Sequence, residues 1–287
     1  MKTLTLKITD EFENKLIKDI LKNYFKLSAG IITRLKKYEN GILLNGERAT
    51  VAKMLKTGDI LEINIMDENS KNIEPIEIPL DILYEDEDIL AVNKSGNMPT
   101  HPSIKHHGDT LANGVMYYYK DKSFTFRAIT RLDRETSGIV LIAKNQLSAK
   151  MLSEQMQKGE ILKEYTAITQ NKPENESGVI DKPIKRANNT LILRCISPDG
   201  KQAITKYKVI GEKNGLYYLK LEPITGRTHQ IRVHLASINC PIYADGLYGT
   251  EIKNERCRLH CSKITFTHPS NGKAITISAP PPKDFDI

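Results

Sequence analysis

One carboxylate lies between two arginines in the segment RLDRETSGIVLIAK, residues 131–144, where Asp133 is flanked by Arg131 and Arg134. Opposite charge within a few ångströms lowers the pKa of a carboxyl group. The pattern therefore predicts an ionised aspartate that can attack an electrophile or accept a proton. The alternative is a solvated turn whose surface ion pairs contribute about 0–1 kcal/mol.

The residues that follow Asp133 favour the catalytic interpretation. Thr136, Ser137 and Gly138 have the chemistry of a turn, and the apolar run 139–142 is typical of a buried strand. The aspartate is thus expected on a loop at the edge of a rigid core. Catalytic groups are often placed on such loops.

The same segment resembles the active site of the RluA family of RNA pseudouridine synthases, and Asp133 matches that family's essential aspartate. Four further blocks resemble the family in the same order: LYEDEDILAVNKSGNMPTHPS (83–103), KEYTAIT (163–169), EPITGRTHQIRVHLASINCPIYADGLYG (222–249) and RLHCSKITFTHP (258–269). The resemblance covers roughly residues 80–282. It implies an isomerase, an intramolecular transferase that converts uridine in RNA to pseudouridine without a cofactor or a metal.

The resemblance also implies roles for individual side chains. Tyr165 matches the tyrosine that lies against the target uracil, where an aromatic ring can stack for about 1–3 kcal/mol. Arg232 matches the active-site arginine and is expected to pair with Asp133, with Arg227 as the second choice. Leu259 resembles the apolar residue that bounds the pocket.

Isomerisation requires the target nucleotide to leave its stack. Arg131 resembles the family residue that enters the vacated space, and a phosphate contact is the alternative role. The helix expected over residues 229–238 also carries His229 and His234. We expect His234 to face the core, and we assign neither histidine a catalytic role.

Two positions depart from the family pattern. Many members have His where this chain has Thr130, and many have Lys-Pro where it has Lys94-Ser95. Neither departure removes a role given above. The threonine at position 130 is expected to change how the catalytic loop is braced. It therefore affects which substrate is recognised more than it affects the reaction itself.

Residues 1–66 resemble the RNA-binding domain named after ribosomal protein S4. This stretch carries twelve Lys and Arg against eight Asp and Glu. A helix is expected over 27–38, with Ser28 as N-cap and with Arg34, Lys36 and Lys37 facing out to bind RNA. Asn45-Gly46 indicates a hairpin turn.

Residues 67–82 contain two prolines and an acidic bias, which predicts an extended linker. The catalytic domain is then expected over 83–287. Its strands are predicted at 89–93, 139–143, 165–169, 203–210, 217–222, 264–267 and 274–278, and its helices at 146–157 and 229–238. This order predicts an α+β fold with a largely antiparallel mixed sheet, a central cleft and few helices, preceded by the small α/β RNA-binding domain.

The amino-acid composition is typical of a globular protein, and its net positive charge favours binding to a polyanion. Hydrophobic residues make up 39% and charged residues 27% of the 287 residues. The net charge of +7 and a pI near 9.0 favour RNA as partner, with ribosomal RNA expected first and transfer RNA second. Without a membrane span or signal peptide, a cytoplasmic monomer is expected. The pair Cys257 and Cys261 lacks the paired spacing of a zinc site.

Two functions from other classes stay open at this stage. One is an RNA-binding assembly factor on a decayed synthase scaffold, which loss of Asp133 or the arginine would favour. The other is a hydrolytic glycosidase or nuclease, although glycosidases usually pair two carboxylates across the bond. The residues do not choose among attack on the sugar, addition to the uracil ring and abstraction of a sugar proton, because one ionised aspartate serves all three.

Overall fold

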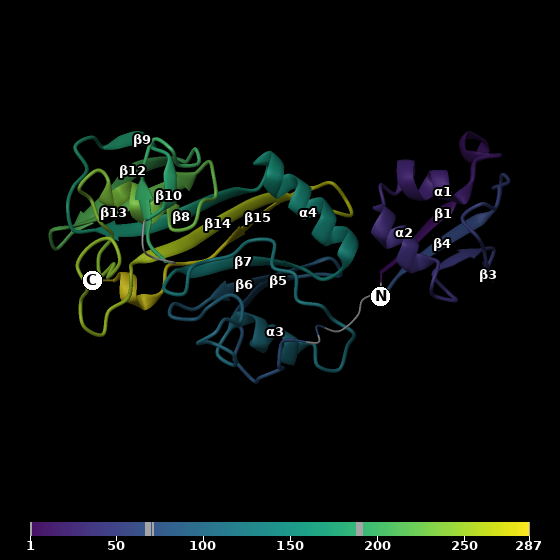
Figure 1. Cartoon of the computed structure of the whole chain (residues 1–287), viewed down its shortest axis with the longest axis horizontal. Helices are drawn as coiled ribbons and strands as arrows, with labels where there is room; N and C mark the ends of the chain where they lie inside the picture. The colour runs from purple at the N-terminus through teal and green to yellow at the C-terminus, as the bar shows by residue number, and fades with distance from the viewer. Residues whose placement is uncertain (1, 67–69, 71, 188–191, 287) are drawn as a thin grey trace.

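The structure is a computed structural model that describes residues 2–66, 70, 72–187 and 192–286 (Figure 1). Its buried apolar side chains form two main clusters. One lies within residues 8–65, and the other begins at Ile89 and extends to Ala279. The α+β prediction is confirmed, because a large, mostly antiparallel sheet dominates and the helices are few.

The N-terminal cluster is built on a four-stranded antiparallel sheet with helical segments against it. In sheet order the strands are β1 (Lys2–Lys7), β4 (Ile60–Ile65), β2 (Ile42–Leu44) and β3 (Glu47–Arg48), and the helical segments are η1 (Asp10–Phe12), α1 (Ile17–Asp19), η2 (Ile20–Tyr24) and α2 (Ala29–Leu35). The turn prediction is confirmed. Asn45 and Gly46 both have positive φ, 56° and 82°, as a tight hairpin requires.

Helix α2 agrees with the sequence-based expectation. The Ser28 hydroxyl accepts a hydrogen bond from the backbone N–H of Ile31 at 3.3 Å and caps the helix. Ile31, Ile32 and Leu35 are buried, whereas the three basic side chains of this segment are exposed, namely Arg34, Lys36 and Lys37. The helix therefore presents positive charge outward because its apolar stripe faces the core.

The second cluster surrounds a nine-stranded sheet. In sheet order its strands are β5 (Ile82–Glu85), β6 (Ile89–Lys94), β7 (Ser137–Ala143), β14 (Leu259–Thr267), β8 (Leu162–Thr169), β13 (Leu216–Pro223), β12 (Ile204–Lys213) and β9 (Ser177–Asp181), with β15 (Ala274–Ser278) paired to β14. The pair β7–β14 is parallel, and the other pairs in this sheet are antiparallel. A separate ribbon joins β10 (Ile184–Arg186) to β11 (Arg194–Ile196).

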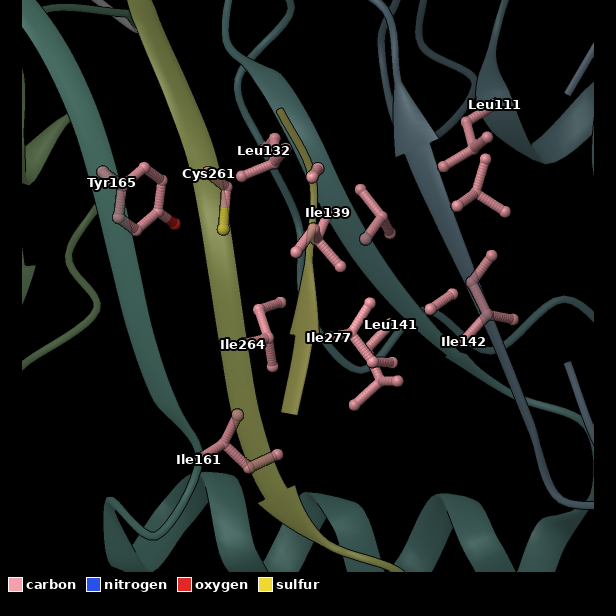
Figure 2. Close-up of a cluster of buried hydrophobic side chains, with 14 of the residues drawn as sticks. Leu111, Leu132, Ile139, Leu141, Ile142, Ile161, Tyr165, Cys261, Ile264 and Ile277 are labelled. Atoms are coloured by element: carbon pink, nitrogen blue, oxygen red, sulfur yellow. The ribbon is translucent and has the colours of Figure 1, made fainter. Parts of the chain in front are cut away.

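Helices α3 (Leu111–Tyr118), α4 (Gln146–Lys158) and α5 (Gln230–Ala236) connect these strands, and η3 (Lys283–Phe285) follows near the C-terminal end. The Asn145 side chain caps α4, which ends where Gly159 takes a left-handed φ of 74°. Apolar side chains of β7, β14 and β15 pack together, and Leu132 and Tyr165 lie at the border of this cluster (Figure 2). A pocket at that border is therefore held by rigid strands.

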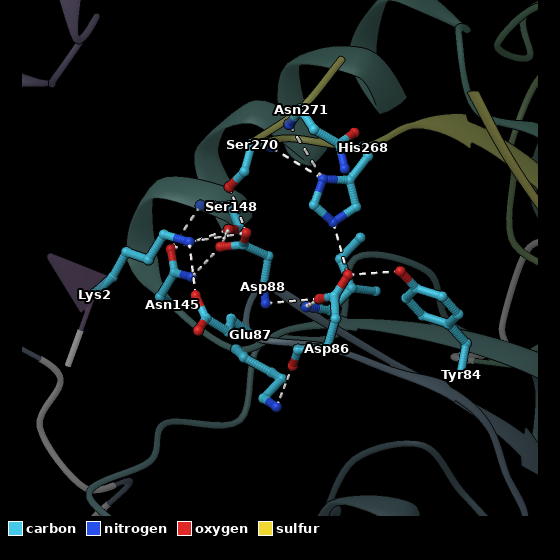
Figure 3. Close-up of polar contacts among 12 residues, drawn as sticks. Lys2, Tyr84, Asp86, Glu87, Asp88, Asn145, Ser148, His268, Ser270 and Asn271 are labelled. Atoms are coloured by element: carbon cyan, nitrogen blue, oxygen red, sulfur yellow. Dashed lines mark hydrogen bonds and ion pairs between the residues drawn. The ribbon is translucent and has the colours of Figure 1, made fainter. Parts of the chain in front are cut away.

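The two clusters meet at α4 (Figure 1). Leu147 packs against the N-terminal core, and Lys2 places its Nζ 3.1 Å from Oδ2 of Asp88 (Figure 3). Burial raises the pKa of Asp88, but hydrogen bonds from Ser270, Ser148 and Asn145 and the contact with Lys2 outweigh it and lower the pKa to about 2. Asp88 is thus an ionised anchor between the N-terminal strand and α4.

Candidate active site

The loop of residues 130–136 carries Asp133 and is anchored on both sides of it. The Thr100 hydroxyl donates to the carbonyl of Leu132 at 3.0 Å and accepts from its N–H at 3.3 Å. The Thr130 hydroxyl accepts from the N–H of Leu141 on β7 at 2.9 Å. Thr130, the residue that departs from the family pattern, therefore braces the loop. The Asp133 side chain stays 25% exposed at the loop's tip.

A glycine brings strand β14 against the start of β7. Gly138 has a φ of +111°, and a Cβ there would lie 2.3 Å from the carbonyl oxygen of Cys261. A side chain at this position would therefore push the two strands apart. Cys261 in turn pairs with Tyr165 across β14 and β8. Through this close approach, the aspartate loop and the strand that bears Tyr165 face the same pocket.

That pocket has a volume of about 400 Å³. Six of the nine site residues predicted from sequence line it: Arg131, Asp133, Tyr165, Arg227, Arg232 and Leu259. They come from the loop before β7, from β8, from the segment before and within α5, and from β14. Residues that are distant in the chain thus converge on one pocket. The other three predicted residues, Arg34, Lys36 and Lys37, lie on the N-terminal unit, in and just after α2.

Tyr165 presents a neutral phenol to this pocket. The residue is 9% exposed, and its hydroxyl points toward Cys261, its partner on β14 (Figure 2). Burial raises the pKa of Tyr165 well above its usual value, and the negative charge of Asp133 raises it further. The phenol is held protonated, so it can donate a hydrogen bond and offer an apolar ring to the pocket that it lines together with Asp133.

The expected pair between Arg232 and Asp133 is wrong for this structure. Arg232 donates from Nε to Oδ2 of Asp245 at 2.8 Å and from Nη2 to Oδ1 at 2.5 Å, and Nη2 also reaches Glu135 at 3.2 Å. Asp245 is fully buried, so it requires a fixed cation. The Arg232 guanidinium, which we expected to pair with Asp133, therefore forms two hydrogen bonds with the buried carboxylate of Asp245 instead.

His229 faces Asp133, a placement that the sequence analysis missed. Its Nε2 lies 3.9 Å from Oδ1 of Asp133, and its Nδ1 lies 2.8 Å from the hydroxyl of Tyr248. The Tyr248 oxygen accepts from the N–H of Arg194 at 2.9 Å, which directs its own proton toward Nδ1. This network assigns the remaining ring proton to Nε2, the nitrogen that faces the carboxylate.

The electrostatic setting keeps His229 neutral. Burial lowers its pKa, the positive charges of Arg232 and Arg194 lower it further, and the charge of Asp133 opposes the shift. His229 also has a φ of 56°, a left-handed conformation that is uncommon outside glycine but that histidine adopts more readily than most residues. Such conformations are found at functional sites that the surrounding structure fixes. By contrast, His234 is buried and bonded to Thr205 and Lys182, as expected.

Two buried basic side chains, Lys94 and Arg256, donate hydrogen bonds to backbone carbonyls of the aspartate loop. Lys94 is 1% exposed and donates to the carbonyls of Ser95, Met98 and Arg134 at 2.8, 2.7 and 3.3 Å. Burial and the charge of Arg256 lower the Lys94 pKa to about 7. Arg256 donates to the carbonyl of Glu135 at 2.9 Å. The backbone on the C-terminal side of Asp133 is therefore fixed.

The four cysteines are free thiols. Within the described ranges, no cluster of three or more His, Cys, Asp or Glu side chains could hold a metal ion. In that same part of the chain, none of the helices has the length and apolar character needed to cross a membrane.

Comparison with known proteins agrees with this geometry. Residues 88–237, just over half of the chain, match the RNA pseudouridylate synthase family. The chain belongs to this family. The members are RNA-modifying isomerases that convert uridine to pseudouridine, and the matched range contains Asp133, Tyr165 and Arg232.

Individual relatives extend the similarity beyond that range. The chain is 35% identical to the uncharacterized RNA pseudouridine synthase YjbO of Bacillus subtilis, over 90% of this chain and 93% of the relative. It is also 35% identical to the ribosomal large subunit pseudouridine synthase D of Haemophilus ducreyi, over 86% and 79%. The structure of human RNA pseudouridylate synthase domain containing 1 aligns with a TM-score of 0.60 at 25% identity, over 72% of this chain and 86% of the human chain.

Proposed function

We propose that this pseudouridine synthase modifies specific uridines in structured RNA, with ribosomal RNA as the first expected substrate and transfer RNA as the second. The relative from Haemophilus ducreyi, which is named for the large ribosomal subunit, supports this choice. The basic charge of the chain supports an RNA partner as well. No cofactor or metal takes part in the proposed reaction.

Asp133 is the proposed essential carboxylate. The observation that carries the proposal is one pocket that holds Asp133 with the Tyr165 phenol and the apolar Leu259. A uracil can lie against the Tyr165 ring while the carboxylate acts at the sugar or at the ring. The N1–C1′ glycosidic bond is broken, the base rotates, and C5 bonds to C1′. C5 then loses its proton to solvent and N1 takes one up, so that atoms balance without a co-reactant.

The uridine must leave its helix to enter a 400 Å³ pocket. Arg131 is exposed at the pocket wall and carries a planar cation, which suits it to fill the vacated stack or to bind a phosphate. We further propose that residues 1–66 are an S4-like RNA-binding domain, joined by the linker 67–82 to the catalytic domain 83–287. Its exposed Arg34, Lys36 and Lys37 would bind phosphates.

Pseudouridine mapping tests the function. Total RNA from cells with and without this gene is compared at single-nucleotide resolution, and the deletion strain is complemented with the wild-type gene or with Asp133→Asn. The proposal predicts that one or more sites disappear on deletion and return with the wild-type gene alone. Unchanged pseudouridine in every RNA, or full restoration by Asp133→Asn, would overturn it.

A further inference from the structure

A second, larger pocket adjoins the one that contains Asp133. It has a volume of about 730 Å³ and lies among the end of α4, the start of β8 and the segment 222–227. Both pockets share six lining residues: Met156, Lys163, Pro223, Thr225, Gly226 and Arg227. The two depressions are therefore neighbours with a common wall. The second one has a volume in the range of ordinary ligand pockets.

The charged residues that line this second pocket are predominantly basic. Four cations, Lys158, Lys163, Arg227 and Lys263, face two carboxylates, Glu164 and Glu222. Both carboxylates pair with Lys220, and Glu164 also pairs with Lys263. Within the described ranges, Lys158 and Lys163 form no ion pair. The pocket thus retains positive charge that its own acidic residues do not neutralise, which favours an anionic ligand.

Lys163 lies at the junction of the two pockets. It lines both of them, and a Cβ added at Gly226 would lie 3.8 Å from its Nζ. Burial lowers the pKa of this ammonium group. The Lys163 Nζ lies 4.0 Å from the sulfur of Met156, and an anion between the pockets would supply the charged partner that the described residues do not. In a nucleic acid strand, the group that lies between two consecutive nucleosides is a phosphate.

Apolar surface at the second pocket fits a base better than a free anion. Leu162 is 62% exposed and Ile224 is 52% exposed, and both line the pocket. Large exposed aliphatic side chains within a concave, basic surface indicate a ligand that carries both charge and an apolar face. A nucleotide meets this description through its phosphate and its planar base, whereas an inorganic anion does not.

We propose that this second pocket binds the nucleotide adjacent to the target uridine on the same RNA strand. The base covers Leu162 and Ile224, and the connecting phosphate lies against Lys163. The inference rests on the proposed function, because it requires an RNA strand whose uridine occupies the Asp133 pocket. It adds that the enzyme extracts and reads a neighbour of the uridine.

The test uses the full chain and a stem-loop RNA that carries the uridine identified by mapping. Two further stem-loops replace either the 5′ or the 3′ neighbour of that uridine with an abasic nucleotide. Turnover is measured for the wild type, for the double variant Leu162→Ser/Ile224→Ser and for Lys163→Gln. Lys208→Gln, an exposed lysine of β12 that lines neither pocket, is the matched control for lost positive charge.

Removing one of the two neighbouring bases should raise the KM of the wild type about tenfold, since covering two exposed aliphatic side chains contributes binding energy of that order. On the intact RNA, the double variant should already show the raised KM. On the abasic RNA, its KM should rise by less than about a further twofold, because the base removal and the two substitutions eliminate the same contact. Lys163→Gln should raise KM on all three RNAs, and Lys208→Gln should follow the wild type.

Two results would overturn the inference alone: a wild type that turns over both abasic RNAs as well as the intact one, or a double variant that is as sensitive to base removal as the wild type. A wild type that fails to modify the intact stem-loop removes the proposed function and this inference with it. The intact-RNA arm therefore separates the two failures.

Discussion

Arg232 holds Asp245 through two hydrogen bonds of 2.8 and 2.5 Å. The pair ties α5 to the turn that follows it, and the contact of Arg232 with Glu135 at 3.2 Å connects both to the aspartate loop. The burial of Asp245 raises its pKa, but the bonds and charge of Arg232 outweigh that effect and lower it. The arginine thus fixes the walls of the pocket around Asp133.

Arg232→Ala should destabilise the protein by about 3–5 kcal/mol, because it leaves Asp245 as a buried, unpaired anion. The pair stabilises the wild type above the usual aspartate pKa, and this stabilisation is lost as pH falls through the lowered pKa. The variant should therefore lose stability most clearly near neutral pH, as measured by urea unfolding.

Arg232→Lys and Arg227→Ala serve as comparisons for that variant. The lysine restores charge without the two-pronged geometry, so stability should return in part. Arg227 is exposed and donates to the carbonyl of Gln202, so its removal should leave the unfolding free energy nearly unchanged. A destabilised Arg227→Ala beside a stable Arg232→Ala would contradict this assignment.

His229→Ala should lower kcat by about tenfold or more with little change in KM for RNA. The Nε2–H that faces Asp133 at 3.9 Å would be lost, and with it a group that positions the carboxylate. Tyr248→Phe should act in the same direction but less strongly, because it removes the 2.8 Å bond that sets the tautomer. Equal kcat values for both variants and the wild type would show that His229 does not position the Asp133 carboxylate for the reaction.

Lys94→Met should change how stability depends on pH. The folded-state pKa of Lys94 is lowered to about 7. Between that value and the usual lysine pKa near 10.4, the unfolded chain binds a proton that the folded protein does not. The unfolding free energy of the wild type should therefore rise with pH in this window, by up to about 1.4 kcal/mol per unit.

Urea midpoints at about pH 7 and about pH 9, compared between Lys94→Met and the wild type, check this sign. The difference between the two proteins should shift in favour of the wild type at the higher pH. Lys150→Met, which changes a partly exposed lysine of α4, controls for the loss of one charge. A constant difference would show that Lys94 does not titrate in this range.

Replacing Arg34, Lys36 and Lys37 with glutamine should weaken RNA binding with little loss of stability, because all three side chains are exposed. Each lost phosphate contact lowers the slope of log affinity against log salt by roughly 0.7–0.9. Filter binding over a salt series measures the slope. A triple variant with the wild-type slope would show that α2 does not contact phosphates.

Much of the fold could be predicted from sequence patterns. Continuous apolar runs indicate β6 and β7, and the expected helix at 146–157 agrees with α4 to within one residue. Helix α3 could not be predicted, because LANGVMYY contains Gly114 and β-favouring residues. Its buried face packs in the core, and a Cβ added at Gly114 would lie 3.1 Å from side-chain atoms of Ile78 and Leu80, so tertiary packing overrides propensity.

The sequence predicted which residues line the site, but it did not predict which side chains contact one another there. Motif blocks indicated which residues would line the pocket, since each block has a recognisable pattern. The choice of Asp245 as the partner of Arg232 depends on a turn 13 residues away that orients a carboxylate into the core. The orientation of His229 depends on its left-handed backbone. Side-chain geometry of this kind is set by packing that sequence spacing does not encode.

The most direct test of the central claim is tritium release from ring-labelled uridine in RNA by Asp133→Asn. Asparagine keeps the size of the side chain and much of its hydrogen bonding but carries no negative charge. Turnover should be abolished while RNA affinity stays within a few-fold of the wild type. Asp199→Asn, which alters an 87% exposed carboxylate, should remain fully active. Substantial turnover by Asp133→Asn would contradict the role of Asp133.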